Sequence, residues 1–122
     1  MEQRYVGSSG LRVSRLALGT MTWGRDTDEH ESRDQLTAFL EAGGTLVDTA
    51  AAYGDGAAEE LLGALLQEVG RREDVVLCTK AGISRRTGER VVDTSRRALL
   101  AGLDNTLRRI GVEHLDLWQL QA

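Results

Sequence analysis

Three residues whose side chains can hold or transfer protons lie at the end of, or shortly after, apolar runs of the kind that form buried strands. Asp48 ends the run Thr45–Asp48, Tyr53 comes shortly after it, and Lys80 directly follows Val75–Thr79. A carboxylate, a phenol and an amine are groups used in general acid–base catalysis. The alternative is a structural ion pair of Asp48 with Lys80 and a tyrosine that only packs, and each residue taken alone favours it. The order and spacing of the three together favour a shared site.

The apolar pattern along the chain predicts strands and helices in alternation. Short β-branched or continuous apolar runs predict strands, and apolar residues at helical spacing, closed by glycine, predict helices. We expect an opening hairpin over residues 5–13, then strands at 16–18, 45–48, 75–79 and 114–120 and helices at 30–41, 57–69 and 94–110.

For the second and third helices, the sequence also indicates residues that stabilise the amino-terminal end, and for the third it indicates an apolar face. Glu59 and Glu60 lie in the first turn of the second helix, where the helix dipole favours negative charge. Asp93 is the expected cap of the third helix. The apolar face of that helix is expected to consist of Leu99, Leu100, Leu103 and Leu107.

The strands are expected to form one parallel sheet in a single α/β unit spanning residues 1–122. Val75–Thr79 lacks polar alternation, which indicates burial on both faces, as parallel sheets require. Connections are short, and neither a proline nor a linker interrupts the chain. In a βα barrel, the carboxyl ends of the strands are where active sites are assembled, and this is where the three proton-bearing residues fall.

Composition excludes several other classes of protein. The hydrophobic fraction of 41% and the charged fraction of 28% are typical of globular chains, and no apolar run approaches the roughly 18 residues of a membrane span. The single cysteine, Cys78, favours a reducing cytoplasm. His30 and His114 have no metal-ligand spacing with Cys78, so no metal site is expected.

Arginine doublets raise the alternative of nucleic-acid binding. Acidic residues are interleaved with them, the net charge is −4 and aromatic residues make up only 4% of the chain, so we expect no nucleic-acid surface. The doublets lie at Arg71-Arg72, Arg85-Arg86, Arg96-Arg97 and Arg108-Arg109.

Four segments, in order, resemble motifs of the aldo-keto reductase family. Leu18–Met21 is similar to the loop after the first barrel strand, and Val47–Gly54 resembles the D-T-A-x-x-Y-G signature. Thr79-Lys80 matches the catalytic lysine segment, and Leu115–Leu120 resembles the D-L-Y/W-Q-L stretch before the catalytic histidine. The resemblance covers nearly the whole chain and implies a partial TIM (β/α)8 barrel, with the hairpin followed by about four parallel βα units. The remaining alternative, an unrelated small α/β binding domain, requires this agreement to be coincidental.

The resemblance implies NADPH-dependent reduction of a small aldehyde or ketone. It makes Tyr53 the general acid that protonates the carbonyl oxygen. Lys80 would favour the phenolate, because a phenol ordinarily titrates near 10, and Asp48 would orient Lys80. The resemblance also places Asp48 and the loop Gly19, Thr20 and Met21 on the nicotinamide side of the cofactor. From local sequence alone, a simple turn at that loop is nearly as well supported.

The sequence departs from the family at its end. Gln121 stands where the family has histidine, and its amide can donate a hydrogen bond but cannot become cationic. A whole barrel needs about 250 residues, so we expect this chain to be an N-terminal half that lacks most of the cofactor site and is inactive or weakly active alone. The alternative is a noncatalytic partner or regulatory fragment. In either case we expect open sheet edges that pair with a second copy or with a separate C-terminal half.

Overall fold

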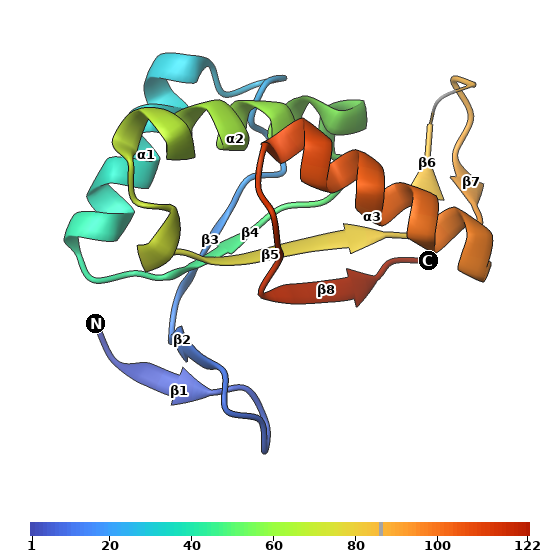
Figure 1. Ribbon diagram of the computed structural model, residues 1–122. Helices are drawn as coiled ribbons and strands as arrows, with labels where there is room; N and C mark the ends of the chain where they lie inside the picture. The colour runs from blue at the N-terminus through green and yellow to red at the C-terminus, as the bar shows by residue number, and fades with distance from the viewer. Residues whose placement is uncertain (86) are drawn as a thin grey trace.

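The computed structural model describes residues 1–85 and 87–122, so Arg86 of the second arginine doublet lies outside the described residues. The chain begins with an antiparallel hairpin of β1 (Gln3–Tyr5) and β2 (Arg12–Ser14), which stands below the rest of the molecule in Figure 1. A parallel sheet follows, in the order β3 (Ala17–Gly19), β4 (Leu46–Asp48), β5 (Val76–Ala81), β8 (Leu117–Leu120).

Three helices connect these strands, and all of them lie on one face of the sheet (Figure 1). They are α1 (Glu29–Glu41), α2 (Ala57–Val69) and α3 (Arg96–Ile110). Two short 3-10 turns, η1 (Tyr53–Gly56) and η2 (Arg72–Asp74), come immediately before α2 and shortly before β5. None of the helices among the described residues has both the length and the apolar character needed to cross a membrane.

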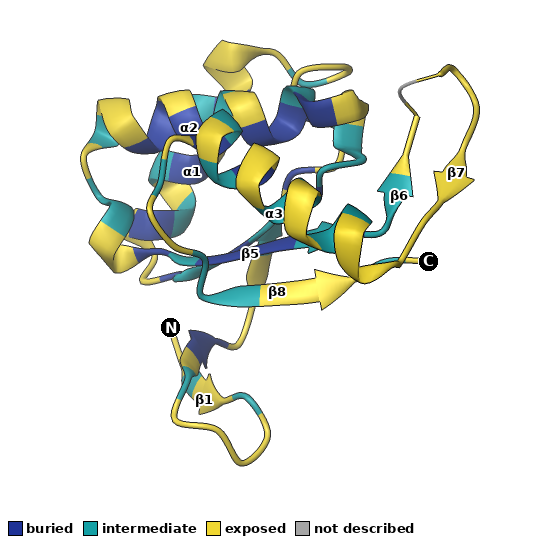
Figure 2. Cartoon of the chain, turned by 45° about the vertical axis from the view of Figure 1, so that its right-hand side comes forward, coloured by how far each residue is buried: buried dark blue, intermediate teal, exposed yellow. Residues whose placement is uncertain are grey.

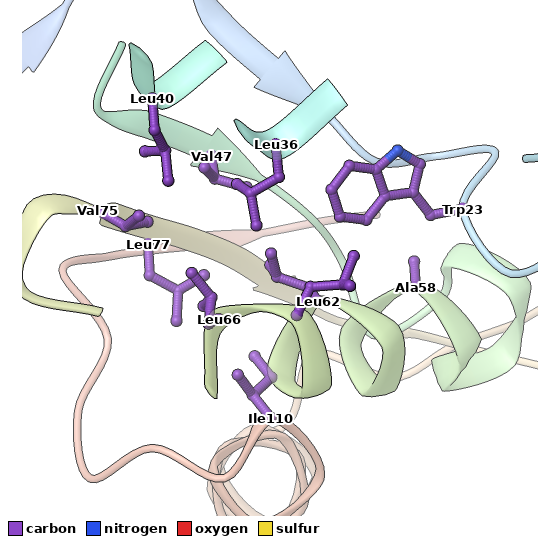
Figure 3. Close-up of a cluster of buried hydrophobic side chains, with 11 residues drawn as sticks. Trp23, Leu36, Leu40, Val47, Ala58, Leu62, Leu66, Val75, Leu77 and Ile110 are labelled. Atoms are coloured by element: carbon purple, nitrogen blue, oxygen red, sulfur yellow. The ribbon is translucent and has the colours of Figure 1, made fainter. Parts of the chain in front are cut away.

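The core fills the space between the helices and the sheet. Leu36 of α1, Leu62 of α2 and Val47 and Leu77 of the central strands are fully buried there, and Trp23 closes one end (Figure 3). The Trp23 Nε1 donates a 2.9 Å hydrogen bond to Gln35 Oε1, so the indole is buried without losing its polar contact. This packing uses one face of β4 and β5, and Asp48 and Lys80 lie on the opposite face.

The helices α2 and α3 approach each other closely at a glycine. A side chain at Gly63 would collide with the backbone of Ile110, which ends α3. The absence of a Cβ therefore allows the two backbones to pack directly, with the middle of α2 against the carboxyl end of α3.

The predicted alternation of strands and helices is confirmed, but several ends differ. Ser95, not Asp93, caps α3: its Oγ accepts from the Ala98 amide, whereas Asp93 Oδ1 accepts from the Ser95 amide in the turn before the helix. The last strand begins at Leu117 rather than at 114, because the Asp116 carboxylate accepts the Leu77 amide before regular pairing starts.

Two further differences concern the region of α3. A small hairpin of β6 (Ile83–Ser84) and β7 (Val91–Val92) was not predicted. The predicted apolar face of α3 is only partly correct, since Leu100 is 52% exposed and the buried residues are Thr106 and Ile110. Figure 2 shows how much of the outer surface of α3 and β8 is exposed.

Candidate active site

The register of the sheet places the predicted site residues at one edge. Asp48 at the end of β4 pairs with Cys78 of β5, so Lys80 lies two residues further along the same face of β5. Tyr53 begins η1, only five residues after the end of β4. Two successive strand ends and one tight turn therefore bring all three side chains together.

The amine of Lys80 is the centre of this group. Its Nζ donates to Asp48 Oδ1 at 2.8 Å, to the carbonyl oxygen of Thr49 at 2.8 Å and to Tyr53 Oη at 3.3 Å. The same Nζ lies 4.9 Å from the centroid of the Tyr53 ring. A lysine amine has three protons to donate, and each of them has an acceptor here.

The surroundings keep Lys80 charged. Burial lowers the pKa of Lys80, but the hydrogen bonds to Asp48 and Tyr53, together with their charges, outweigh it and leave this pKa above its ordinary value of 10.5. The Lys80 and Asp48 side chains are 15% and 32% exposed. The site is thus a sheltered cation held against a phenol.

Two neighbours of this group were not predicted as site residues. Cys78 is buried on the same sheet face as Asp48 and Lys80, and its Sγ donates to Gln119 Oε1 at 3.3 Å. Burial, followed by the charge of Asp48, raises the pKa of Cys78 to about 12, so the thiol is neutral at ordinary pH. The signal that could have found both residues is strand alternation, since 78 and 80 share a face and Gln119 pairs with Lys80.

Residues 15–122 match the sequence profile of the Aldo/keto reductase family. The chain belongs to the aldo-keto reductase family. The fold agrees: a solved holo form of the aldo-keto reductase AKR11C1 from Bacillus halodurans superposes with a TM-score of 0.88 at 35% identity, covering 98% of this chain and 40% of that one. The predicted α/β class and partial TIM barrel are confirmed.

Two curated proteins with different names are similar in sequence to this chain. Aldo-keto reductase YhdN of Bacillus subtilis (strain 168) is 34% identical over 125 residues, which cover 98% of this chain and 38% of that protein. Probable voltage-gated potassium channel subunit beta of Oryza sativa subsp. japonica is 35% identical over 119 residues, covering 96% and 36%. The chain therefore spans about two fifths of the length of these family members.

The loop that the family resemblance assigns to the cofactor lies beside Asp48. Gly19 pairs with Asp48 across β3 and β4, and a Cβ built on Gly19 would meet no atom within 4 Å. Met21 is 58% exposed. Thr20 is fully buried, and both its amide and its hydroxyl donate at 3.1 Å to the Asp48 carbonyl oxygen, so this threonine supports Asp48. Cofactor contact by this loop stays a prediction.

Gln121, which occupies the position of the family histidine, lies at the same edge of the sheet. Its backbone N–H donates to the Ala81 carbonyl oxygen at 2.8 Å, directly after the paired residues Ala81 and Leu120. Within the described part of the chain, no hydrogen bond joins the Gln121 side chain to Asp48, Tyr53 or Lys80. The structure therefore brings three of the four predicted catalytic residues into contact and places the fourth nearby.

A cleft of about 540 Å³ lies between the β6–β7 hairpin and α3. Its walls include Ala51, Ala81 and Gly82, which are close in sequence to Tyr53 and Lys80, but not the three proton-bearing residues themselves. We therefore locate the candidate site by its chemistry, on the sheet face opposite the helices.

Proposed function

We propose that this chain supplies the proton-transfer site of an NADPH-dependent oxidoreductase that reduces aldehydes or ketones to alcohols. The observation that carries the proposal is the contact of the Lys80 amine with both Asp48 Oδ1 and Tyr53 Oη. Family membership and a relative solved in a holo form support the reaction class and the use of a bound cofactor. Residues 1–122 would form the N-terminal half of the reductase barrel.

Tyr53 is the general acid in this proposal. Its hydroxyl donates a proton to the carbonyl oxygen, and the Lys80 ammonium, 3.3 Å from that hydroxyl, stabilises the phenolate that remains. Asp48 holds the ammonium in place and keeps it charged. When bound, NADPH supplies the hydride that adds to the carbonyl carbon.

The residues present are compatible with a flat nicotinamide ring next to Asp48. The open space over Gly19 and the exposed side chain of Met21 leave room for such a ring at the end of β3. Gln121 would orient the carbonyl by donating a hydrogen bond from its amide, without the positive charge that a histidine can carry. Since we assign most cofactor contacts to later βα loops of the barrel, residues 1–122 alone are expected to bind NADPH weakly and to have little activity.

The test joins residues 1–122 to the remaining C-terminal part of the Bacillus subtilis relative, which aligns over 98% of this chain. NADPH oxidation is followed by absorbance with a panel of aldehydes and ketones. We expect turnover, and a loss of about 100-fold or more in kcat for Tyr53→Phe, the scale of general acid catalysis. A folded chimera without turnover, or one in which Tyr53→Phe has no effect, refutes the proposal. Tight NADPH binding by residues 1–122 alone would refute the assignment of most cofactor contacts to later loops.

A second candidate function is a noncatalytic partner that assembles through its sheet edges. Gln121 in place of histidine and the related potassium channel subunit favour it. So do the edge strand β8 and its apolar side chains Trp118 and Leu120, which are 38% and 62% exposed. It requires stable homo- or hetero-oligomers without turnover. Sedimentation velocity at micromolar concentration checks this. A folded monomer whose sedimentation coefficient does not change when candidate partners are added contradicts it.

A further inference from the structure

A carboxylate outside the candidate site is buried completely in the layer between helices and sheet. Glu59, in the first turn of α2, has no exposed surface. Its oxygens accept from Thr79 Oγ1 at 2.7 Å, from Thr106 Oγ1 at 3.0 Å and from Arg109 Nη1 at 2.6 Å. A buried charge is expensive unless it is paired and hydrogen-bonded, and Glu59 meets both conditions.

The contacts of Glu59 join three elements at a particular point. Thr79 immediately precedes Lys80 on β5 and faces the helices, whereas Lys80 faces the opposite side of the sheet. Glu59 itself follows the turn η1, which begins with Tyr53 and leads directly into α2. The carboxylate therefore ties the helix that continues from Tyr53 to the strand residue next to Lys80.

The backbone around η1 is shaped to fit this arrangement. Gly56, the residue before α2, has a φ of 97°, and a Cβ built there would lie 2.7 Å from Arg109 Nε. The guanidinium that pairs with Glu59 thus also packs against the end of the turn that carries Tyr53. The Glu59–Arg109 ion pair therefore packs against the end of the turn that carries Tyr53 and also binds Thr79, the residue next to Lys80.

We propose that Glu59 is a positioning residue that sets the separation between the Tyr53 hydroxyl and the Lys80 amine through its bond to Thr79. The catalytic meaning of this separation rests on the proposed function, but the separation itself is a property of the folded chain. The competing explanation is that Glu59 only adds stability by joining α2, α3 and β5. The two explanations differ in what removing the Thr79 bond does to Lys80 while the chain stays folded.

The sequence provides a direct probe, because Lys80 is its only lysine. Lysine labelled with ¹³C gives one set of NMR signals, and the Lys80 amine lies 4.9 Å from the centroid of the Tyr53 ring. The ring shifts the signals of nuclei above its face, so the Lys80 methylene next to the amine reports its distance from Tyr53 at neutral pH. Tyr53→Leu defines the position of this signal without the ring.

Two threonines form a matched pair for the test. Thr79 and Thr106 are 0% and 1% exposed, and each donates its hydroxyl to Glu59. We expect Thr79→Val to remove about half or more of the ring-induced shift, since the hydrogen bond that fixes β5 is lost. We expect Thr106→Val to remove much less, and Thr79→Ser, which keeps the hydroxyl, to retain the wild-type signal. Urea unfolding of each variant separates changes in stability from changes in position.

The result that overturns the proposal is a Lys80 signal that stays at its wild-type position in folded Thr79→Val, or that moves equally in Thr106→Val. If Thr79→Val does not fold, Thr79→Ala is measured in its place with the same expected result, because it also removes the hydroxyl that donates to Glu59. The experiment needs neither NADPH nor substrate. An unmoved signal therefore refutes the positioning role alone, and absent turnover in the chimera refutes the reductase function alone.

Discussion

Replacing Asp48 by asparagine tests the electrostatic basis of the site. Asparagine keeps an oxygen where Asp48 Oδ1 accepts from Lys80 at 2.8 Å, so the geometry can persist while the negative charge is lost. A hydrogen bond to a charged group contributes about 1.5–3 kcal/mol. The pair is 15% and 32% exposed, which screens it in part, so we expect the free energy of unfolding at pH 7 to fall by about 1–2 kcal/mol.

The pH dependence of this loss has a definite sign. The pKa of Lys80 in the folded chain is raised above 10.5, so the pair stabilises the fold fully below about pH 10.5 and loses this effect as the pH rises through the raised value. The difference in stability between wild type and Asp48→Asn should thus be constant from about pH 7 to 9 and shrink above about 10.5.

The assay is urea unfolding followed by tryptophan fluorescence, since Trp23 is fully buried in the native core. Asp26→Asn is the matched control: Asp26 pairs with Arg25 at 2.8 Å, but both side chains are more than 60% exposed, and its loss should leave the midpoint unchanged. The reasoning is refuted if Asp48→Asn lowers the free energy of unfolding no more than this control does. It is also refuted if the difference between wild type and Asp48→Asn does not shrink above about pH 10.5.

Two further predictions concern burial and close packing. With Cys78 buried and its pKa raised to about 12, a thiol reagent at pH 8 should label the native chain far more slowly than the urea-unfolded chain, and equal rates would contradict this. Gly63→Ala should lower the free energy of unfolding by about 1–3 kcal/mol, because the new methyl group collides with the backbone of Ile110. Gly102→Ala, in the interior of α3 with its nearest neighbour at 3.6 Å, should instead leave stability unchanged or raise it by up to about 1 kcal/mol, and thermal unfolding of the two variants checks the contrast.

Local patterns accounted for most of the elements, because strand and helix periodicity and glycine stops depend on near neighbours in the chain. They failed where a segment is short or polar. The β6–β7 hairpin pairs only two residues on each side and has no clear alternation. The choice between Asp93 and Ser95 as cap depended on a turn in which the first residue binds the amide of the second.

The charge pattern of α2 shows the same limit. Glu59 and Glu60 are neighbours in the first turn, and both were interpreted alike, as negative charges that the helix dipole favours. In the structure Glu60 is exposed, whereas Glu59 has no exposed surface and binds Thr79, Thr106 and Arg109. Its three partners come from positions 20, 47 and 50 residues away, and no local rule connects them.

The sequence by itself determined that Asp48 and Lys80 would stand at the ends of neighbouring strands, because apolar runs precede both and the motifs occur in order. Only the tertiary structure decided what these side chains bind. The register that pairs Asp48 with Cys78 brings the Lys80 amine within reach of a carboxylate, a carbonyl oxygen and a phenol that lie 27–32 residues away in the chain. Contacts of this kind depend on how whole elements pack, since a hydrogen bond forms only when both partners are held within about 3 Å of each other.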